Sequence, residues 1–171
     1  SATTAWAETQ AELGQALEAL GEREATETNL RAAISAFQAA LEVLTRDKNP
    51  REWAAVQSSF ASTLRNLGLR ERGTELLVAA VAAHRAALTV FNRREARLQW
   101  AAVQTNLGGT LEVLGNRTEG TRSLEEAIEV LDSALTVLDR RRDPLAWVHA
   151  QMNLGAALQA LGHRLRDTVR L

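Results

Sequence analysis

The four tryptophans of this chain lie at one fixed interval of 47 residues, as Trp6, Trp53, Trp100 and Trp147. Glutamine, leucine, glycine and arginine residues keep the same register, for example Gly21, Gly68, Gly115 and Gly162. A fixed period of this size is typical of repeat proteins. The register predicts a single repeat domain over 1–171, with repeats of about 1–47, 48–94 and 95–141 and a truncated fourth repeat of 142–171.

Each repeat is predicted to contain two helices. Apolar side chains at helical spacing predict a first helix over about residues 50–67, with Asn49 as its cap, Pro50 in its first turn and Gly68 as a left-handed terminator. A second stripe predicts a second helix over about residues 119–141, whose last turn carries Arg140, Arg141 and Arg142. No alternating strand pattern is present, so the fold class is all-α.

Composition excludes several classes of function. The net charge of −1 argues against general attraction to nucleic acid or membranes, and the absence of cysteine excludes disulfides and thiolate chemistry. No long apolar run or secretory signal occurs, which predicts a cytoplasmic location. Because the chain starts at Ser1 and stops early in its fourth repeat, we expect a fragment of a larger protein.

The repeat unit resembles the tetratricopeptide repeat. Leu13-Gly14, Leu107-Gly108 and Leu154-Gly155 match the Leu-Gly pair of its first helix, and Ala33-x3-Phe37-x2-Ala40 matches its second helix. Ala80, His84 and Ala87, and then Ala127, Leu131 and Ala134, repeat the second part with changed central residues. The period is longer than the usual 34 residues, as in repeats of large bacterial multidomain proteins.

The resemblance implies an α-solenoid of antiparallel helix pairs that winds as a right-handed superhelix. It also implies a protein-protein interaction scaffold, whose first helices line a concave groove for a peptide or protein partner. The alternative is a sensory or regulatory domain that binds a small ligand or signal peptide and controls an attached effector. Carried over, the groove-lining positions are Ser58, Ser62, Arg65, Thr105, Asn106, Gly109, Glu112, Met152, Asn153 and Gln159. They could equally form a solvated, alanine-rich face.

No enzymatic activity, metal or cofactor is expected. The three histidines occupy unrelated positions in the repeat, and neither zinc spacings nor phosphate-binding loops occur. His84 replaces Phe37 and Leu131 on the inner face of its helix. We expect a half-buried histidine with a hydrogen bond to a neighbouring helix, in preference to a ligand-binding group.

Two periodic sets are expected to be structural. The tryptophans are interpreted as packing residues near the joint between repeats, with an exposed aromatic ladder as the alternative. A polar residue within an apolar stripe needs a partner, so the glutamines are expected to bridge helices or, alternatively, to border the groove. They are Gln10, Gln57, Gln104 and Gln151.

The two ends of the array lack polar caps. Leu154, Leu158 and Leu161 of the fourth repeat face only the short segment 165–171 where a second helix is due. Solenoids need polar terminal repeats to prevent their open faces from associating. We therefore expect a homodimer, or end-to-end association through the uncapped terminal repeats.

Overall fold

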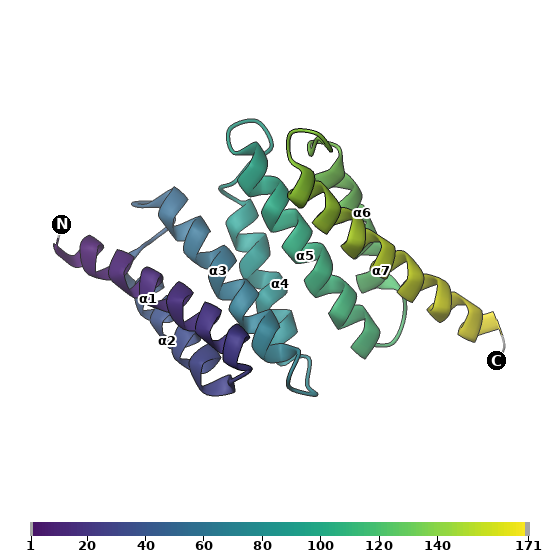
Figure 1. Cartoon of the computed structure of the whole chain (residues 1–171), viewed down its shortest axis with the longest axis horizontal. Coiled ribbons are helices and arrows are strands. Elements are labelled where there is room, and N and C mark those ends of the chain that lie inside the picture. The colour runs from purple at the N-terminus through teal and green to yellow at the C-terminus, as the bar shows by residue number, and fades with distance from the viewer. Residues whose placement is uncertain (1, 170–171) are drawn as a thin grey trace. The chain divides into compact units, whose positions relative to one another are not determined.

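The computed structural model describes residues 2–169, and the side chains of residues 3–166. Over this part of the chain every element is a helix, seven in all, which confirms the predicted all-α class. The chain divides into two compact units, Ser1–Val90 and Phe91–Leu171. Figure 1 labels the helices of both units.

The first unit contains two helix pairs. Helix α1 (Ala2–Glu24) packs on α2 (Glu27–Val43), and α3 (Pro50–Gly68) packs on α4 (Glu75–Leu88) (Figure 1). Helix α3 also contacts α2 and α1, so the two pairs form one body. Its core includes Phe37 and Leu44 from the second helix and Val56 from the third, with Trp53 packed against them.

The second unit contains three helices. Helix α5 (Arg97–Arg117) packs on α6 (Arg122–Leu135), and α7 (Pro144–Val169) contacts both. Its core joins Ala101, Ala134, Leu138 and Ala150, with the rings of Trp100 and Trp147 against them. The guanidinium of Arg140 lies 5.3 Å from the centroid of the Trp147 ring, in cation–π geometry.

The predicted first helix of repeat two is confirmed, since α3 begins at Pro50 and ends at Gly68. Asn49 occupies the cap position, but its side chain makes no capping hydrogen bond. The prediction that a left-handed glycine ends this helix is wrong, because the only glycine with positive φ among the described residues is Gly120. In α1 the left-handed residue is Ala25, and Thr26 N–H donates to the Gly21 carbonyl, as in a Schellman cap.

The glycines of this register serve close packing. A Cβ atom on Gly21 would lie 2.9 Å from Leu30, and one on Gly115 would lie 2.7 Å from Leu124. Real Cβ atoms do not approach another side chain so closely. Only glycine, which has no side chain, therefore leaves room at these positions for the leucine of the second helix. Gly162 lies inside α7, which continues to Val169, so the predicted break after it is also wrong.

The predicted second helix over residues 119–141 is too long. Helix α6 ends at Leu135, and its last turn contains no basic residue. Arg140, Arg141 and Arg142 therefore lie in the α6–α7 connection. Their predicted role at the helix dipole is wrong.

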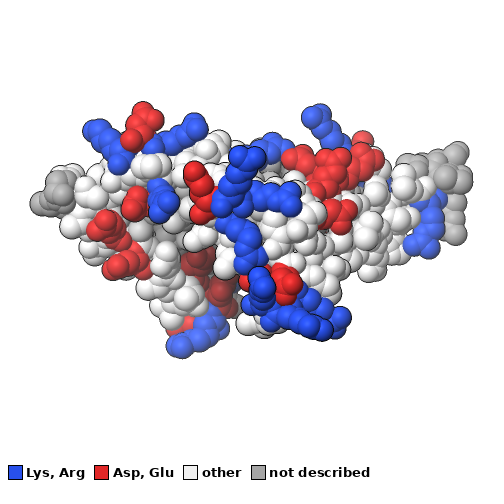
Figure 2. All heavy atoms as spheres, turned by 90° about the horizontal axis from the view of Figure 1, so that it is seen from above, with Lys and Arg blue, Asp and Glu red and all other residues white. Residues whose placement is uncertain are grey.

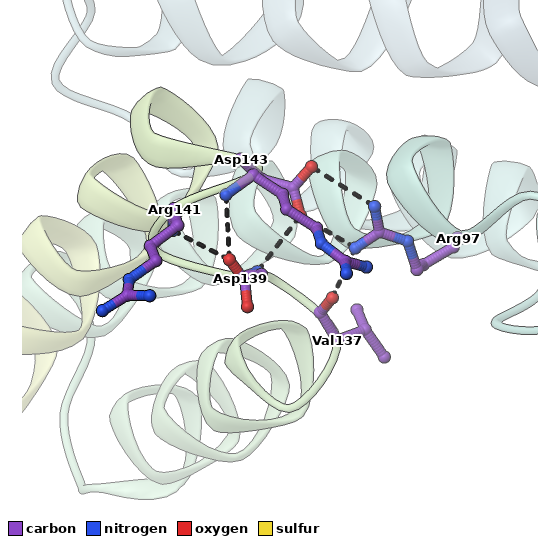
Figure 3. A network of polar contacts seen from close by, with 6 residues as sticks. Arg97, Val137, Asp139, Arg141 and Asp143 are labelled. Carbon is purple, nitrogen blue, oxygen red and sulfur yellow. Dashed lines mark hydrogen bonds and ion pairs between the residues drawn. The ribbon is translucent and has the colours of Figure 1, made fainter.

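A polar network organises that connection (Figure 3). One oxygen of Asp139 accepts the backbone N–H groups of Arg141 and Arg142, each at 2.8 Å. Arg97, at the start of α5, forms a two-pronged ion pair with Asp143 at 2.8 and 3.2 Å. It also donates to the Val137 carbonyl. These contacts hold the loop before α7 against α5 and lower the pKa values of both aspartates, through the Arg97 side chain at Asp143 and backbone N–H groups at Asp139.

Within each unit, the periodic arginine bonds the end of the first helix of the preceding repeat. Arg70 donates to the Gly21 carbonyl at 3.0 Å. Arg164 makes the equivalent bond to the Gly115 carbonyl at 3.1 Å, and also reaches the carbonyls of Thr118 and Gly120. The last carbonyls of a helix have no partner inside it. The arginine of the following repeat supplies a hydrogen-bond donor to these carbonyls.

Candidate functional site

The side-by-side packing of α5 and α7 forms a seam lined by residues that the sequence placed in the groove; we call it the α5–α7 groove. Asn153 Nδ2 donates to the Thr105 carbonyl at 3.3 Å and joins the two helices. Two hollows lie along this seam. Figure 2 shows acidic side chains next to basic ones over the face in view, which argues against a large surface of one charge there.

The larger hollow has a volume of about 290 Å³ and is open to solvent. Two of its residues, Glu112 and Gln159, were predicted from the sequence as groove residues. The lining consists of Glu112, Asn116, Ala156, Gln159, Ala160 and His163. The alanines leave space, and the remaining four side chains supply a carboxylate, two amides and an imidazole.

Hydrogen bonds orient part of this lining. Asn116 Nδ2 donates to Glu112 Oε1 at 2.5 Å, which leaves the second carboxylate oxygen available to a bound group. Nη2 of Arg166 lies 3.5 Å from His163 Nδ1 on the other side. The arrangement can hold a polar or cationic group by hydrogen bonds. It contains no nucleophile with an adjacent base, which an acyl-transfer site would need.

The smaller hollow has a volume of about 90 Å³ and is lined by Ala102, Thr105, Asn106, Ala146 and His149. Thr105 is only 3% exposed, and its hydroxyl donates to the Ala101 carbonyl of its own helix. Gly109 is also buried. These two predicted positions therefore offer little surface to a partner. Asn106 is half-buried, and Met152 and Gln159 are exposed.

In the first unit the predicted residues lie on α3. Ser58, Ser62 and Arg65 are half-buried, and the Ser62 hydroxyl donates to the Ser58 carbonyl one turn earlier. The sequence did not indicate the polar group on the neighbouring α1. Asn66 Nδ2 donates there to Glu22 at 2.5 Å and to Glu18 at 3.4 Å.

Glu18 is the most perturbed carboxyl group of this unit. Its pKa is raised to about 7, mainly by burial and to a smaller extent by the charge of Glu22, while a hydrogen bond with the Thr63 side chain partly opposes the change. Glu18 occupies the register position of Arg65, Glu112 and Gln159. The register alone could therefore have added Glu18 of the first repeat to the predicted groove residues.

His84 departs from its prediction. It is fully buried, and neither ring nitrogen has a hydrogen-bond partner. The prediction of a half-buried, hydrogen-bonded histidine is wrong. Burial, together with the nearby charge of Arg65, lowers its pKa to about 4, so the ring is neutral at pH 7. It fills a packing position, which agrees with the phenylalanine and leucine at the same place in the other repeats.

Three of the four tryptophans pack against a core. Trp53, Trp100 and Trp147 pack against the cores of their units, whereas Trp6 is 47% exposed. The glutamines do not form the expected bridges: none is seen in the described residues, and Oε1 of Gln104 is buried without a partner.

Asn116 and His163 are the two polar residues of the larger hollow that the sequence analysis missed. Each follows a predicted groove residue by four positions, Asn116 after Glu112 and His163 after Gln159. Residues four apart share one face of a helix, so extending the predicted stripe by one turn would have found both.

Over the residues that the structure describes, no three His, Asp or Glu side chains are grouped so that they could hold a metal ion. Within the same range, none of the helices has the length and apolar character required to span a membrane. Comparison of the chain with protein-family models, with curated proteins and with solved structures finds no match.

Proposed function

We propose that this chain is a protein-interaction scaffold whose first helices present a groove to a peptide or protein segment. The full arrangement would be a right-handed α-solenoid of the tetratricopeptide type, with the groove along the stacked first helices. The supporting observation is the α5–α7 groove, where residues spaced by the repeat come together around one hollow, Glu112 and Asn116 from α5 and Gln159 and His163 from α7.

The size of the hollows favours a peptide over a small ligand. Small-molecule sites usually enclose about 300–1,000 Å³ and bury most of their ligand. The larger hollow, of about 290 Å³, is open, and the smaller one measures about 90 Å³. Each suits one side chain of an extended segment. A sensory domain with a small ligand is the second candidate, and it would require the two hollows to merge.

A displayed peptide library panned on the whole chain tests the proposal. We expect enriched peptides with a basic or amide side chain, because the hollow offers the Glu112 carboxylate and the Gln159 amide. Glu112→Gln should weaken the selected peptides about five- to tenfold. Glu129→Gln is the matched control, since it removes the same charge from an exposed position on α6. Equal losses in both variants, or no enrichment at all, would contradict the proposal.

A second comparison separates binding from folding. Asn106 lines the smaller hollow, whereas Trp100 packs against the core of its unit. We expect Asn106→Ala to keep its helicity and lose affinity for the selected peptides, and Trp100→Ala to melt early. If Asn106→Ala melts as early as Trp100→Ala, the groove is assigned to the wrong residues.

A further inference from the structure

In the α1–α2 and α5–α6 pairs, large side chains of the second helix rest on two glycines of the first, whereas α3 keeps only the second of these glycines, Gly68, and has Ala61 in place of the first. Gly108 faces Leu131 and Gly115 faces Leu124, so closely that a Cβ atom on either glycine would overlap the leucine. In α1, a Cβ atom on Gly14 would lie 2.7 Å from Phe37. A pair of glycines seven residues apart therefore marks the place where a second helix docks.

Helix α7 carries the same pair, and none of the residues that the structure describes is docked on it. A Cβ atom on Gly155 or Gly162 would meet no atom within 4 Å. Leu158, between them, is 51% exposed, whereas Leu111 at the same register position in α5 is 2% exposed. Leu165, one turn beyond Gly162, is 50% exposed. We call the surface of Leu154, Gly155, Leu158, Gly162 and Leu165 the α7 glycine face. It continues the repeating helix-pair interface onto the last helix.

The helices that dock on such faces share one sequence pattern. Each presents leucine, alanine, a large residue and alanine at spacings of three, four and three, and a second large residue follows four positions later, beyond the end of the helix. All fifteen positions are buried, at 8% exposure or less: Leu30, Ala33, Phe37, Ala40, Leu44; Leu77, Ala80, His84, Ala87, Phe91; Leu124, Ala127, Leu131, Ala134, Leu138. Each of these helices also has a glutamate in its first turn.

Charge indicates that a helix on α7 would dock in the same direction as α6 docks on α5. In the α5–α6 pair, the Gly115 end of α5 meets Leu124, next to Glu125 in the first turn of α6. A helix docked in the same way on α7 would start beside Gly162. Arg166 lies there, exposed, one turn further on, with its Nε bonded to the Gly162 carbonyl. An acidic first turn on the incoming helix would pair with this cation.

We propose that the α7 glycine face binds, in trans, an amphipathic helix of this pattern with an acidic first turn. A second copy of this chain is a poorer occupant, because its own helices of this pattern are buried at every pattern position. It would have to release one of them from its pair. The inference does not depend on the α5–α7 groove, and either proposal can fail alone.

The test uses a synthetic peptide that copies residues 121–138, fluorescently labelled, with the whole chain in solution. We expect one peptide to bind per chain. The double variant Gly155→Ala/Gly162→Ala should bind at least tenfold more weakly, because each added methyl group occupies the space of an incoming leucine. A control peptide with aspartate at the positions of Leu124 and Leu131 should not bind.

The double variant also controls for folding. Both new side chains meet open space, and alanine favours a helix over glycine, so its helicity and melting temperature should equal or exceed those of the parent. Equal binding to parent and variant would mean that the peptide replaces α6 of the chain, and would overturn the proposal. Failure of the peptide to bind either protein would also overturn the proposal. A third contrary result would be a dimer, seen by light scattering, that the double variant abolishes while the peptide does not bind, because the occupant of the face would then be a second copy of the chain.

Discussion

At the scale of single residues, two positions of each repeat are matched to one another. Gly14 lies under Phe37, and Gly108 lies under Leu131. In repeat two the same positions hold Ala61 and His84, so a methyl group on the first helix accompanies a smaller ring on the second. A buried histidine without hydrogen bonds is thereby explained as a space-filling choice, at the cost of leaving two ring nitrogens without partners.

One substitution at two equivalent glycines should have opposite effects. Gly108→Ala should destabilise the chain by about 1–3 kcal/mol, because the new methyl group overlaps Leu131 in a packed interface. Gly155→Ala should stabilise it by up to about 1 kcal/mol, because it gains helix propensity in open space. Urea denaturation followed by circular dichroism measures both. Destabilisation of similar size at the two positions would show that α7 is covered in solution.

At the scale of helices, an arginine of the following repeat bonds the end of a first helix within each unit, Arg70 at Gly21 and Arg164 at Gly115. Arg164→Ala should cost about 1.5–3 kcal/mol, because its guanidinium serves the carbonyls of Gly115, Thr118 and Gly120. Arg166→Ala is the control, since Arg166 is exposed and its bonds to described residues are those to the Gly162 carbonyl and His163. It should change stability by less than about 0.5 kcal/mol. Equal melting curves for the two variants would contradict the anchoring role.

The limits of the helices show what the sequence could predict. The helical spacing and Pro50 predicted an all-helical chain of helix pairs and the start of α3, since these signals are local. Local signals did not distinguish a glycine that ends a helix from one that receives a leucine, because the difference at Gly21 and Gly115 lies in the partner helix. The basic run at 140–142 was wrongly placed in a helix: α6 ends at Leu135, and Asp139 turns the backbone after it through two local hydrogen bonds.

The candidate site was predicted in part. The register brought Glu112 and Gln159 to one hollow, and it also selected Thr105 and Gly109, which are buried. Periodicity gives the face of a helix on which a residue lies. It does not give the depth of that residue once the next helix has packed on it.

At the scale of the whole molecule, two perturbed groups give the stability opposite dependences on pH. His84 has a pKa of about 4 in the folded chain and 6.5 when unfolded. The unfolded chain therefore takes up a proton first as the pH falls, and the folded state loses stability between pH 6.5 and 4. Glu18 has a pKa of about 7 when folded and 4.5 when unfolded. The folded chain takes up this proton first, so it gains stability as the pH falls from 7 to 4.5.

Removing one group should expose the effect of the other. In Glu18→Gln, stability should fall by about 3 kcal/mol between pH 6.5 and 4, which corresponds to the lowered pKa of the buried His84. In His84→Gln, stability should instead rise as the pH falls from 7 to 4.5. The pH dependence of the stability of the parent should lie between those of the two variants, because the contributions of His84 and Glu18 oppose each other. Urea denaturation at half-unit steps of pH provides the curves. Parallel curves for the parent and both variants would mean that neither group keeps its folded-state pKa in solution, and that water reaches the α1–α3 and α3–α4 contacts.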